Sequence, residues 1–200
     1  MKRMKFCTIC LVLAWVPAVS VAAPSGSRQR LADYFAALNR YDFEACLTFY
    51  AADAVTVHGN ERTPFDRKVG QGYREFEAAT HARFTYQIRS ITGDTADVFE
   101  TESNDFYKVL GNETHESHWA YRFREGLIYE EVQLNPPNAD YLKAYRALRA
   151  WIHQANPEVF KTVTSEDGNL VFNGRTAAAI MSLAREWRDT QGGSASPRTH

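Results

Sequence analysis

His58 is the side chain whose type and position best suit acid–base chemistry. It ends a β-rich run from Ala54 to His58, directly before Gly59. An imidazole has an unperturbed pKa of about 6.5, so it can remove and return a substrate proton near neutral pH. We therefore predict that His58 is a catalytic base. The alternative is a hydrogen-bonded histidine at the strand end, on the rim of the molecule.

Tyr34 is a polar side chain within an apolar pattern. The stripe of Leu31, Tyr34, Phe35 and Leu38 has the i, i+3, i+4, i+7 spacing that predicts a helix from about Arg28 to Arg40. The Tyr34 hydroxyl is either a hydrogen-bond donor in a site or a packed aromatic group that binds a backbone partner.

Aromatic residues alternate along the run from His115 to Phe123, which we predict to be a strand. Because side chains alternate between the faces of a strand, one face carries Ser117, Trp119, Tyr121 and Phe123. We expect this aromatic face to be the inner one. His118 then points outward, opposite to His115, so the two histidines make a poor zinc pair and we predict no metal site.

Glu130 lies on the last predicted strand, Leu127 to Leu134. The mainly aliphatic face of this strand consists of Ile128, Glu130, Val132 and Leu134. If this face points inward, Glu130 lies on a cavity wall, where loss of solvation raises its pKa unless a cation or a donor such as Tyr34 stabilises the charge. If Leu127 and Tyr129 point inward instead, Glu130 is an ordinary surface acid.

Other polar or reactive residues are interpreted structurally. We predict that Cys46 is a small core residue and that Asp53 braces the turn into the first strand. Gly70-Gln71-Gly72 lacks the third glycine or the Lys-Ser/Thr of a phosphate loop. The facing of Asp105 is not readable from the sequence, because a bulge can interrupt the alternation of its strand.

The composition is that of a globular protein. The chain has 200 residues, of which 44% are hydrophobic and 13% are aromatic, and its 23 basic and 24 acidic residues give a formal net charge of −1. These values exclude a disordered or collagenous chain, and they give no electrostatic reason to expect a nucleic-acid partner. Without a basic stripe, the aromatic content is better explained as cavity lining than as a base-stacking surface.

The first 22 residues have the layout of a signal peptide. A basic start is followed by the apolar stretch Phe6 to Val16 and by small residues that end at Ala22. An uncleaved anchor is the alternative, but the stretch is shorter than the roughly 20 residues that a spanning helix needs. We expect cleavage after Ala22 and export to the bacterial periplasm or the extracellular space, without stable membrane insertion. Cleavage leaves Cys46 as the one cysteine, so no intramolecular disulfide is expected.

The mature chain has an α+β pattern. Three amphipathic helical stretches come first, and four predicted antiparallel strands follow: Phe84 to Thr92, Thr95 to about Leu110, His115 to Phe123 and Leu127 to Leu134. We assign residues 28–135 to one domain and residues 138–190 to a helical extension, capped near Asn138. The two apolar helix faces of the extension should pack on the domain or on a partner. Residues 191–200 are predicted to be a mobile tail.

The N-terminal half resembles a known superfamily. Tyr34-Phe-Ala-Ala-Leu-Asn39, then Asp42, then Phe49-Tyr-Ala-Ala-Asp-Ala-Val55, with Gly70-x-Gly before the third helix, is similar to the nuclear transport factor 2-like superfamily. The stretch is most similar to its ketosteroid isomerases and SnoaL-like polyketide cyclases, and the match covers about residues 28–134. The resemblance implies a cone: a curved antiparallel sheet packed on three N-terminal helices, with a cavity that ligands enter from the open end.

The same resemblance suggests roles for individual residues. Tyr34 occupies the position of an oxyanion-hole tyrosine of ketosteroid isomerase. His58 stands where that family has a carboxylate base, and Trp119 stands near its protonated aspartic acid. Two of the three positions therefore depart from the isomerase pattern.

Three classes of function remain open. The first is a cofactor-free isomerase, cyclase or dehydratase of a small, mostly apolar carbonyl compound. In it, His58 is the base, Tyr34 the donor and Glu130 a second acid, and the ligand lies against Trp119, Tyr121, Phe123, Tyr50 and Val132. The second is an exported module that binds a small hydrophobic ligand without changing it. The third is an interaction scaffold whose open sheet face pairs with another copy, as a homodimer, or with the appended segment.

Overall fold

A computed structural model of the chain describes residues 25–136 and 138–193. The predicted signal peptide, residues 1–22, lies outside the described residues, as do residues 194–200 of the predicted tail. The first three residues of that tail, 191–193, are the end of a helix.

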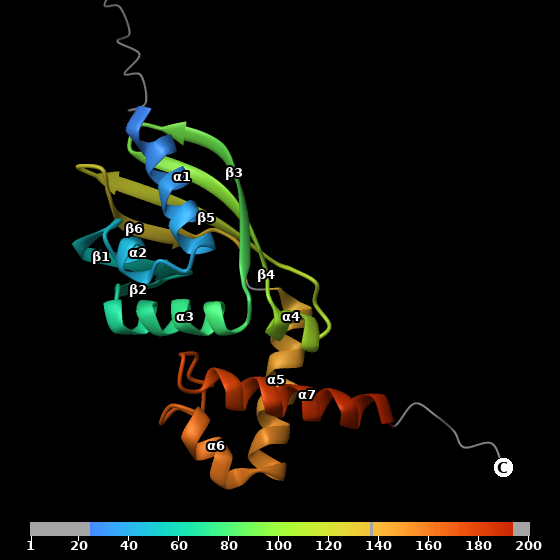
Figure 1. The fold of residues 1–200 in the computed structure, drawn as a ribbon. Helices are drawn as coiled ribbons and strands as arrows, with labels where there is room; N and C mark the ends of the chain where they lie inside the picture. The colour runs from blue at the N-terminus through green and yellow to red at the C-terminus, as the bar shows by residue number, and fades with distance from the viewer. Residues whose placement is uncertain (1–24, 137, 194–200) are drawn as a thin grey trace, which may run out of the picture.

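Three helices form the N-terminal layer: α1 (Ser25–Asn39), α2 (Phe43–Leu47) and α3 (Arg67–Ala79). The stripe predicted on α1 is buried, with exposures of 0 to 4% for Leu31, Tyr34, Phe35 and Leu38. Asp42 and Asp66 cap α2 and α3, because each carboxylate accepts hydrogen bonds from backbone N–H groups of the first turn. Figure 1 shows α1 lying across the curved sheet and α3 crossing its lower end.

Six strands form one mixed sheet in the order β2-β1-β6-β5-β4-β3. The strands are β1 (Tyr50–His58), β2 (Glu61–Pro64), β3 (Arg83–Thr92), β4 (Thr95–Ser103), β5 (His115–Arg124) and β6 (Leu127–Gln133). The four C-terminal strands form the predicted antiparallel meander. The expectation of an entirely antiparallel sheet is wrong, because β1 pairs in parallel with β6. That pairing joins segments about 75 residues apart, for which local sequence patterns carry no signal.

The strand predicted from Thr95 to about Leu110 is shorter than expected. It ends at Ser103, and residues Asp105–Val109 form the short helix α4. Asn104 causes the change, because its side chain accepts a hydrogen bond from the Tyr107 N–H and caps the helix. The chain therefore turns away from the sheet directly after its last inward-facing residue.

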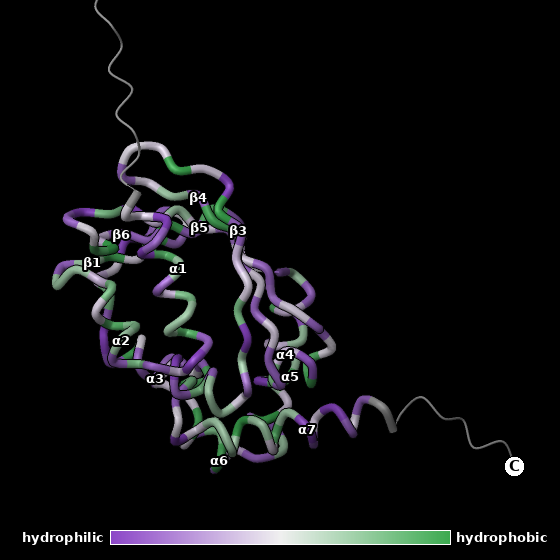
Figure 2. The backbone as a smooth tube through the Cα atoms, turned by 45° about the horizontal axis from the view of Figure 1, so that its top comes forward, coloured by the Kyte–Doolittle hydropathy of each residue, from purple (hydrophilic) through white to green (hydrophobic). Residues whose placement is uncertain are grey.

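The C-terminal extension consists of α5 (Ala139–Ala155), α6 (Pro157–Val163) and α7 (Ala177–Gly193). Asn138 caps α5, as predicted. Leu148, Ile152 and Ile180 of the extension are fully buried in a second core, which also contains Phe76 of α3 and Phe106 of α4. The extension therefore packs against the end of the cone (Figure 1). Towards its C-terminal end α7 becomes hydrophilic and projects from the molecule (Figure 2). Among the described residues, no helix is both long and apolar enough for a transmembrane span.

Candidate active site

A cavity of about 520 Å³ lies inside the cone, within the range of roughly 300 to 1,000 Å³ that is typical of small-molecule sites. Its lining comes from α1, α3, α4 and the inner face of the sheet, together with Tyr141 of α5 and Phe172, which lies between α6 and α7. Eleven aromatic residues contribute to the wall: Tyr34, Phe65, Tyr73, Phe76, Phe84, Phe106, Tyr107, Trp119, Tyr121, Tyr141 and Phe172. Aromatic side chains therefore form a large part of the surface that the cavity offers to a ligand.

The aromatic face of β5 points into the cone, as the alternation predicts. Trp119 and Tyr121 line the cavity, whereas Phe123 is buried in the core of the cone. His118 lies on the outer face, where its Nε2 is 2.6 Å from an Asp97 carboxylate oxygen and its ring stacks on Phe99.

Tyr34 borders the cavity and begins a chain of hydrogen bonds. The Tyr34 and Tyr50 hydroxyls are 2.9 Å apart, and the Tyr50 hydroxyl donates to Glu131 Oε2 at 2.9 Å. The other Glu131 oxygen accepts a hydrogen bond from Thr56 Oγ1 at 2.8 Å. Because Tyr50 has a single hydroxyl proton, which it donates to Glu131, Tyr34 must donate to Tyr50. Arg74 Nη2 approaches the Tyr34 oxygen at 3.5 Å, and every donor thus points towards Glu131.

Burial sets the ionisation of this chain. Loss of solvation raises the pKa values of Tyr34, Tyr50 and Glu131, so both tyrosines remain protonated at neutral pH. The hydrogen bonds from Thr56 and Tyr50 oppose this effect at Glu131 by stabilising its charged form. Tyr50 supports this chain and does not line the cavity itself.

Glu130 and Val132 do not line the cavity, which corrects the predicted facing of β6. Opposite β5, Phe123 pairs with Ile128 but Arg122 pairs with Glu130, so Tyr129 is an extra residue that forms a bulge. A bulge shifts the alternation by one residue. Ile128 therefore faces the core, as predicted, but beyond the bulge it is Glu131 and Gln133 that face inward.

The carboxylate of Glu130 is buried on the opposite face of the sheet. It forms ion pairs there with Arg62 and Arg122. A cation partner was considered only for an inward-facing Glu130, and an outward-facing Glu130 was expected to be exposed, so neither alternative placed a buried ion pair on the outer face.

Sequence reasoning missed Glu77 and Glu131, and it also missed two cavity carboxyls of a single strand, Glu100 and Glu102. They lie on the inner face of β4, opposite Ser117 and His115 of β5. Glu100 accepts a hydrogen bond from the Tyr121 hydroxyl, and burial raises its pKa to about 8. A usable signal existed, because Ala96, Val98, Glu100 and Glu102 share one face by alternation and begin with buried apolar residues.

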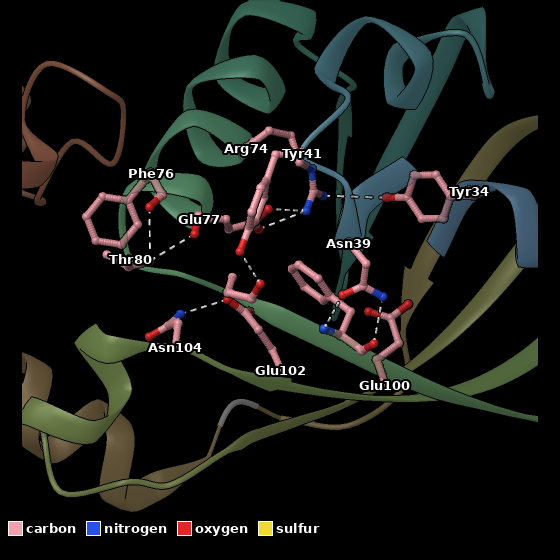
Figure 3. Close-up of polar contacts among 12 residues, drawn as sticks. Tyr34, Asn39, Tyr41, Arg74, Phe76, Glu77, Thr80, Glu100, Glu102 and Asn104 are labelled. Atoms are coloured by element: carbon pink, nitrogen blue, oxygen red, sulfur yellow. Dashed lines mark hydrogen bonds and ion pairs between the residues drawn. The ribbon is translucent and has the colours of Figure 1, made fainter. Parts of the chain in front are cut away.

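Glu102 lies towards the extension. Its two oxygens accept hydrogen bonds from Asn104 Nδ2 at 2.7 Å and from the Tyr107 hydroxyl at 3.0 Å. Burial, aided by the neighbouring charge of Glu77, raises its pKa to about 7. The Arg74 guanidinium does not contact Glu102; it forms an ion pair with Glu77 at 2.6 Å (Figure 3).

The two histidines of the cavity lie near opposite ends. His58 is exposed at the rim, with Nδ1 2.8 Å from Gln133 Oε1 and its ring 5.7 Å from that of Trp119. An amide oxygen only accepts hydrogen bonds, so Nδ1 carries the proton and the lone pair of neutral His58 is on Nε2. His115 is half-buried beside Tyr107 and Tyr141, and burial lowers its pKa. His115 is therefore uncharged at neutral pH.

The remaining candidates have structural roles. Gly70 and Gly72 allow close approaches, since a Cβ at Gly70 would lie 2.9 Å from the Phe65 ring and one at Gly72 would lie 3.2 Å from the Phe172 carbonyl oxygen. Cys46 is buried, as predicted. Asp53 pairs with Arg124, and Asp105 pairs with His81 on the surface. The described residues contain no group of three His, Cys, Asp or Glu side chains placed to hold a metal ion.

Comparison with known proteins gives similarity at the level of solved structures. No protein-family model and no curated protein matches the chain. An NTF2-like protein of unknown function from Cytophaga hutchinsonii aligns with a TM-score of 0.44 and 11% identity over 58% of this chain and 94% of its own. A putative polyketide cyclase from Silicibacter sp. aligns with a TM-score of 0.45 and 18% identity over 60% and 94%, respectively.

A de novo designed protein with a curved β-sheet is also similar, with a TM-score of 0.48 and 12% identity over 61% of this chain and 93% of its own. The two natural neighbours are described as an NTF2-like protein and a putative polyketide cyclase, which are the groups named by the sequence resemblance. Similarity of this degree carries no argument about activity, which has to come from the cavity itself.

Proposed function

We propose that this protein binds a small, largely apolar carbonyl compound in the cavity and moves a proton between two of its carbons. The observation that carries the proposal is the hydrogen-bonded chain Tyr34–Tyr50–Glu131, which runs from the cavity wall to an enclosed carboxyl. Such a chain fixes the position of the Tyr34 hydroxyl at the cavity wall, where it can stabilise a carbonyl oxygen that becomes negatively charged.

The reaction uses His58 and Tyr34 in complementary roles. Nε2 of His58 takes a proton from the carbon next to the carbonyl group, and the electron pair moves to the carbonyl oxygen. The Tyr34 hydroxyl turns from Tyr50 and donates a hydrogen bond to that oxygen, which stabilises its negative charge. Return of the His58 proton to a different carbon, as the electron pair moves back from the oxygen, completes an isomerisation. Atoms and charges balance without a further reactant.

The test is deuterium exchange at the carbons next to the carbonyl of 2-tetralone in D₂O, followed by NMR. The wild-type protein should accelerate exchange over buffer. We expect His58→Ala to lower the protein-dependent rate by about 10² to 10⁴ and Tyr34→Phe to lower it by about 10². Tyr86→Phe is the matched control, because Tyr86 is an exposed residue that stacks on Phe35 outside the cavity.

A pair of substitutions distinguishes the roles of the two neighbouring acids of β6. Glu131→Gln should slow deuterium exchange, whereas Glu130→Gln, on the opposite face of the sheet, should not. Equal rates for the wild type and for both His58→Ala and Tyr34→Phe would show that these side chains do not perform the proposed chemistry.

A non-catalytic binding module is the second candidate. The observation in its favour is that Glu131 and Tyr50 already have hydrogen-bond partners, as expected of a rigid pocket. Native mass spectrometry of the purified protein tests it. A retained small molecule that survives unchanged, with no exchange activity, would support binding alone.

We also infer that the protein is exported after removal of residues 1–22. The basic start, apolar stretch and small residues of that segment support this inference. Intact mass measurement of the secreted or periplasmic protein should give a chain that begins at Ala23. A full-length chain retained in the membrane fraction would contradict export.

A further inference from the structure

The cavity contains more acidic groups than the described protein neutralises. Four glutamates line it: Glu77, Glu100, Glu102 and Glu131. Within residues 25–136 and 138–193, only Glu77 of these four forms an ion pair with a cationic side chain, that of Arg74. Enclosed charges in proteins are normally paired or neutralised by a proton. The cavity therefore lacks a counter-charge for up to three carboxyls.

Glu100 has a free acceptor that borders the cavity. Its Oε1 accepts from the Tyr121 hydroxyl, whereas its Oε2 has no hydrogen-bond partner among the described residues. Glu100 lines the cavity, and burial raises its pKa to about 8. A carboxyl oxygen in a cavity wall with unused hydrogen-bonding capacity can accept from a donor that the ligand supplies.

Glu102 lies next to Glu100 on the same face of β4. Residues two apart along a strand are separated by about 7 Å. An ammonium group has three donors, and with hydrogen bonds of about 2.8 Å to each carboxylate it fits between two such side chains. Figure 3 shows both side chains on the same side of β4, Glu102 leaning towards Asn104 and Glu100 rising below Asn39.

The surroundings of these carboxyls also favour a cation. The Tyr107, His115 and Tyr141 rings gather at the Glu102 end, with centroids 5.3 Å apart, and Trp119 lies further along β5. The negatively charged faces of aromatic rings attract ammonium groups. His115 adds no competing charge, because its pKa is lowered by burial.

From this arrangement we infer that the ligand of the cavity carries a basic nitrogen and binds as an ammonium ion between Glu100 and Glu102. The inference rests on the proposed function in one respect only, that the same cavity is the binding site. It narrows the proposed carbonyl ligands to those that also carry an amino group on an aromatic or apolar skeleton, and it disfavours carboxylates and phosphates of the same shape.

Three probes of matched shape test the inference: tryptamine, tryptophol and indole-3-acetate, which differ in charge at one end of a shared indole skeleton. Isothermal titration calorimetry at pH 7 should give an affinity for tryptamine about tenfold or more above that for tryptophol, with indole-3-acetate the weakest. Tenfold corresponds to about 1.4 kcal/mol.

Two variants test whether Glu100 and Glu102 cause the preference for tryptamine. Glu100→Gln and Glu102→Gln should each reduce the preference for tryptamine over tryptophol while the affinity for tryptophol is retained, which also shows that the cavity is folded. Glu116→Gln is the matched control, because Glu116 is exposed on the outer face of β5. It should bind all three probes like the wild type.

Proton release gives a further readout. The titratable or charged groups around the two carboxyls are Arg74 and Glu77 from α3, Tyr107 from α4, His115 and Tyr121 from β5, and Glu131 from β6. A cation that binds the ionised carboxyls displaces their protons, so tryptamine should release protons at pH 7 and tryptophol should not. Titrations in two buffers of different ionisation enthalpy measure this release.

Tryptophol or indole-3-acetate binding as tightly as tryptamine would overturn the inference, and the exchange assay on 2-tetralone would still decide the proposed function separately. A preference for tryptamine that survives in both variants would also overturn it, because the charge would then be recognised elsewhere. If none of the three probes binds to the wild type, the inference is wrong.

Discussion

Replacement of Glu100 by glutamine should make the protein more stable in mildly alkaline solution. In the folded state Glu100 lies in the cavity wall with Tyr121 as its hydrogen-bond donor, and burial raises its pKa from 4.5 to about 8. In the unfolded chain the same carboxyl is solvated and loses its proton near its ordinary pKa. Glutamine has nearly the same shape and needs no proton to be neutral.

The size of the effect follows from the difference between the two pKa values. One pKa unit corresponds to about 1.4 kcal/mol, so the change from 4.5 to about 8 costs the folded state up to about 5 kcal/mol once Glu100 is ionised. Below pH 4 Glu100 is protonated in both the folded and the unfolded state, so it does not lower the free energy of unfolding. Stability then falls as pH rises from about 4.5 to 8, and it levels off above pH 8. Because the carboxyl borders a cavity that can admit water, we expect ionisation of Glu100 to lower the free energy of unfolding by about 2 to 5 kcal/mol.

The assay is urea unfolding of the wild type and of Glu100→Gln at pH 5 and pH 8.5. The two proteins should be similar at pH 5, and the variant should be more stable by the stated amount at pH 8.5. It should retain a smaller pH dependence from Glu102, whose pKa is raised to about 7. Glu116→Gln should follow the wild type. A wild-type stability that is the same at both pH values would refute the reasoning about burial.

Further predictions concern the bulge, the close packing and the cysteine. Glu130→Gln should lower the free energy of unfolding by about 1 to 3 kcal/mol, measured in urea, because the Arg62 and Arg122 guanidinium groups lose a buried charged partner; an unchanged stability would contradict this. Gly72→Ala should lower the free energy of unfolding by about 1 kcal/mol, because the added Cβ would lie 3.2 Å from the Phe172 carbonyl oxygen. This cost should exceed the gain from the higher helix propensity of alanine. Gly26→Ala, at the open start of α1, should leave stability unchanged or raise it. Burial raises the pKa of Cys46 from 9.0 to about 11. Its reaction with a thiol reagent at pH 8 should therefore be at least about 100-fold slower in the folded protein than in urea. Equal rates would show that the thiol is at the surface.

Several elements were predictable because their signals are local. The apolar stripe of α1 has the period of a helix, Asp42 and Asn138 are polar caps at helix starts, and the aromatic alternation of β5 gives the inner and outer faces correctly. In each case the residues that determine the structure lie within one or two turns, or within one strand. Tyr34 and His58 were found in the same way and do border one cavity.

The parallel pairing of β1 with β6 and the C-terminal end of β4 were not predictable from local signals. Pairing of β1 with β6 depends on how the helices bring the chain back to the sheet. The end of β4 depends on a single side chain, because Asn104 begins a helix where the polar pattern still permits a strand. A short polar run is compatible with both structures, and only the cap decides between them.

The sequence alone predicted α+β layers with an aromatic inner face, because side-chain periodicity is a property of each segment, but it left open whether Tyr34 and His58 belong to a site. Only the tertiary structure decided which carboxyls meet that interior. The bulge at Tyr129 turns Glu131 towards the cavity and Glu130 away from it. The pairing of β4 with β5 encloses Glu100 and Glu102, and the extension adds Tyr141 and Phe172 to the cavity wall. Loss of solvation, which gives these carboxyls their unusual pKa values, depends on everything packed around them, and no single segment contains that information.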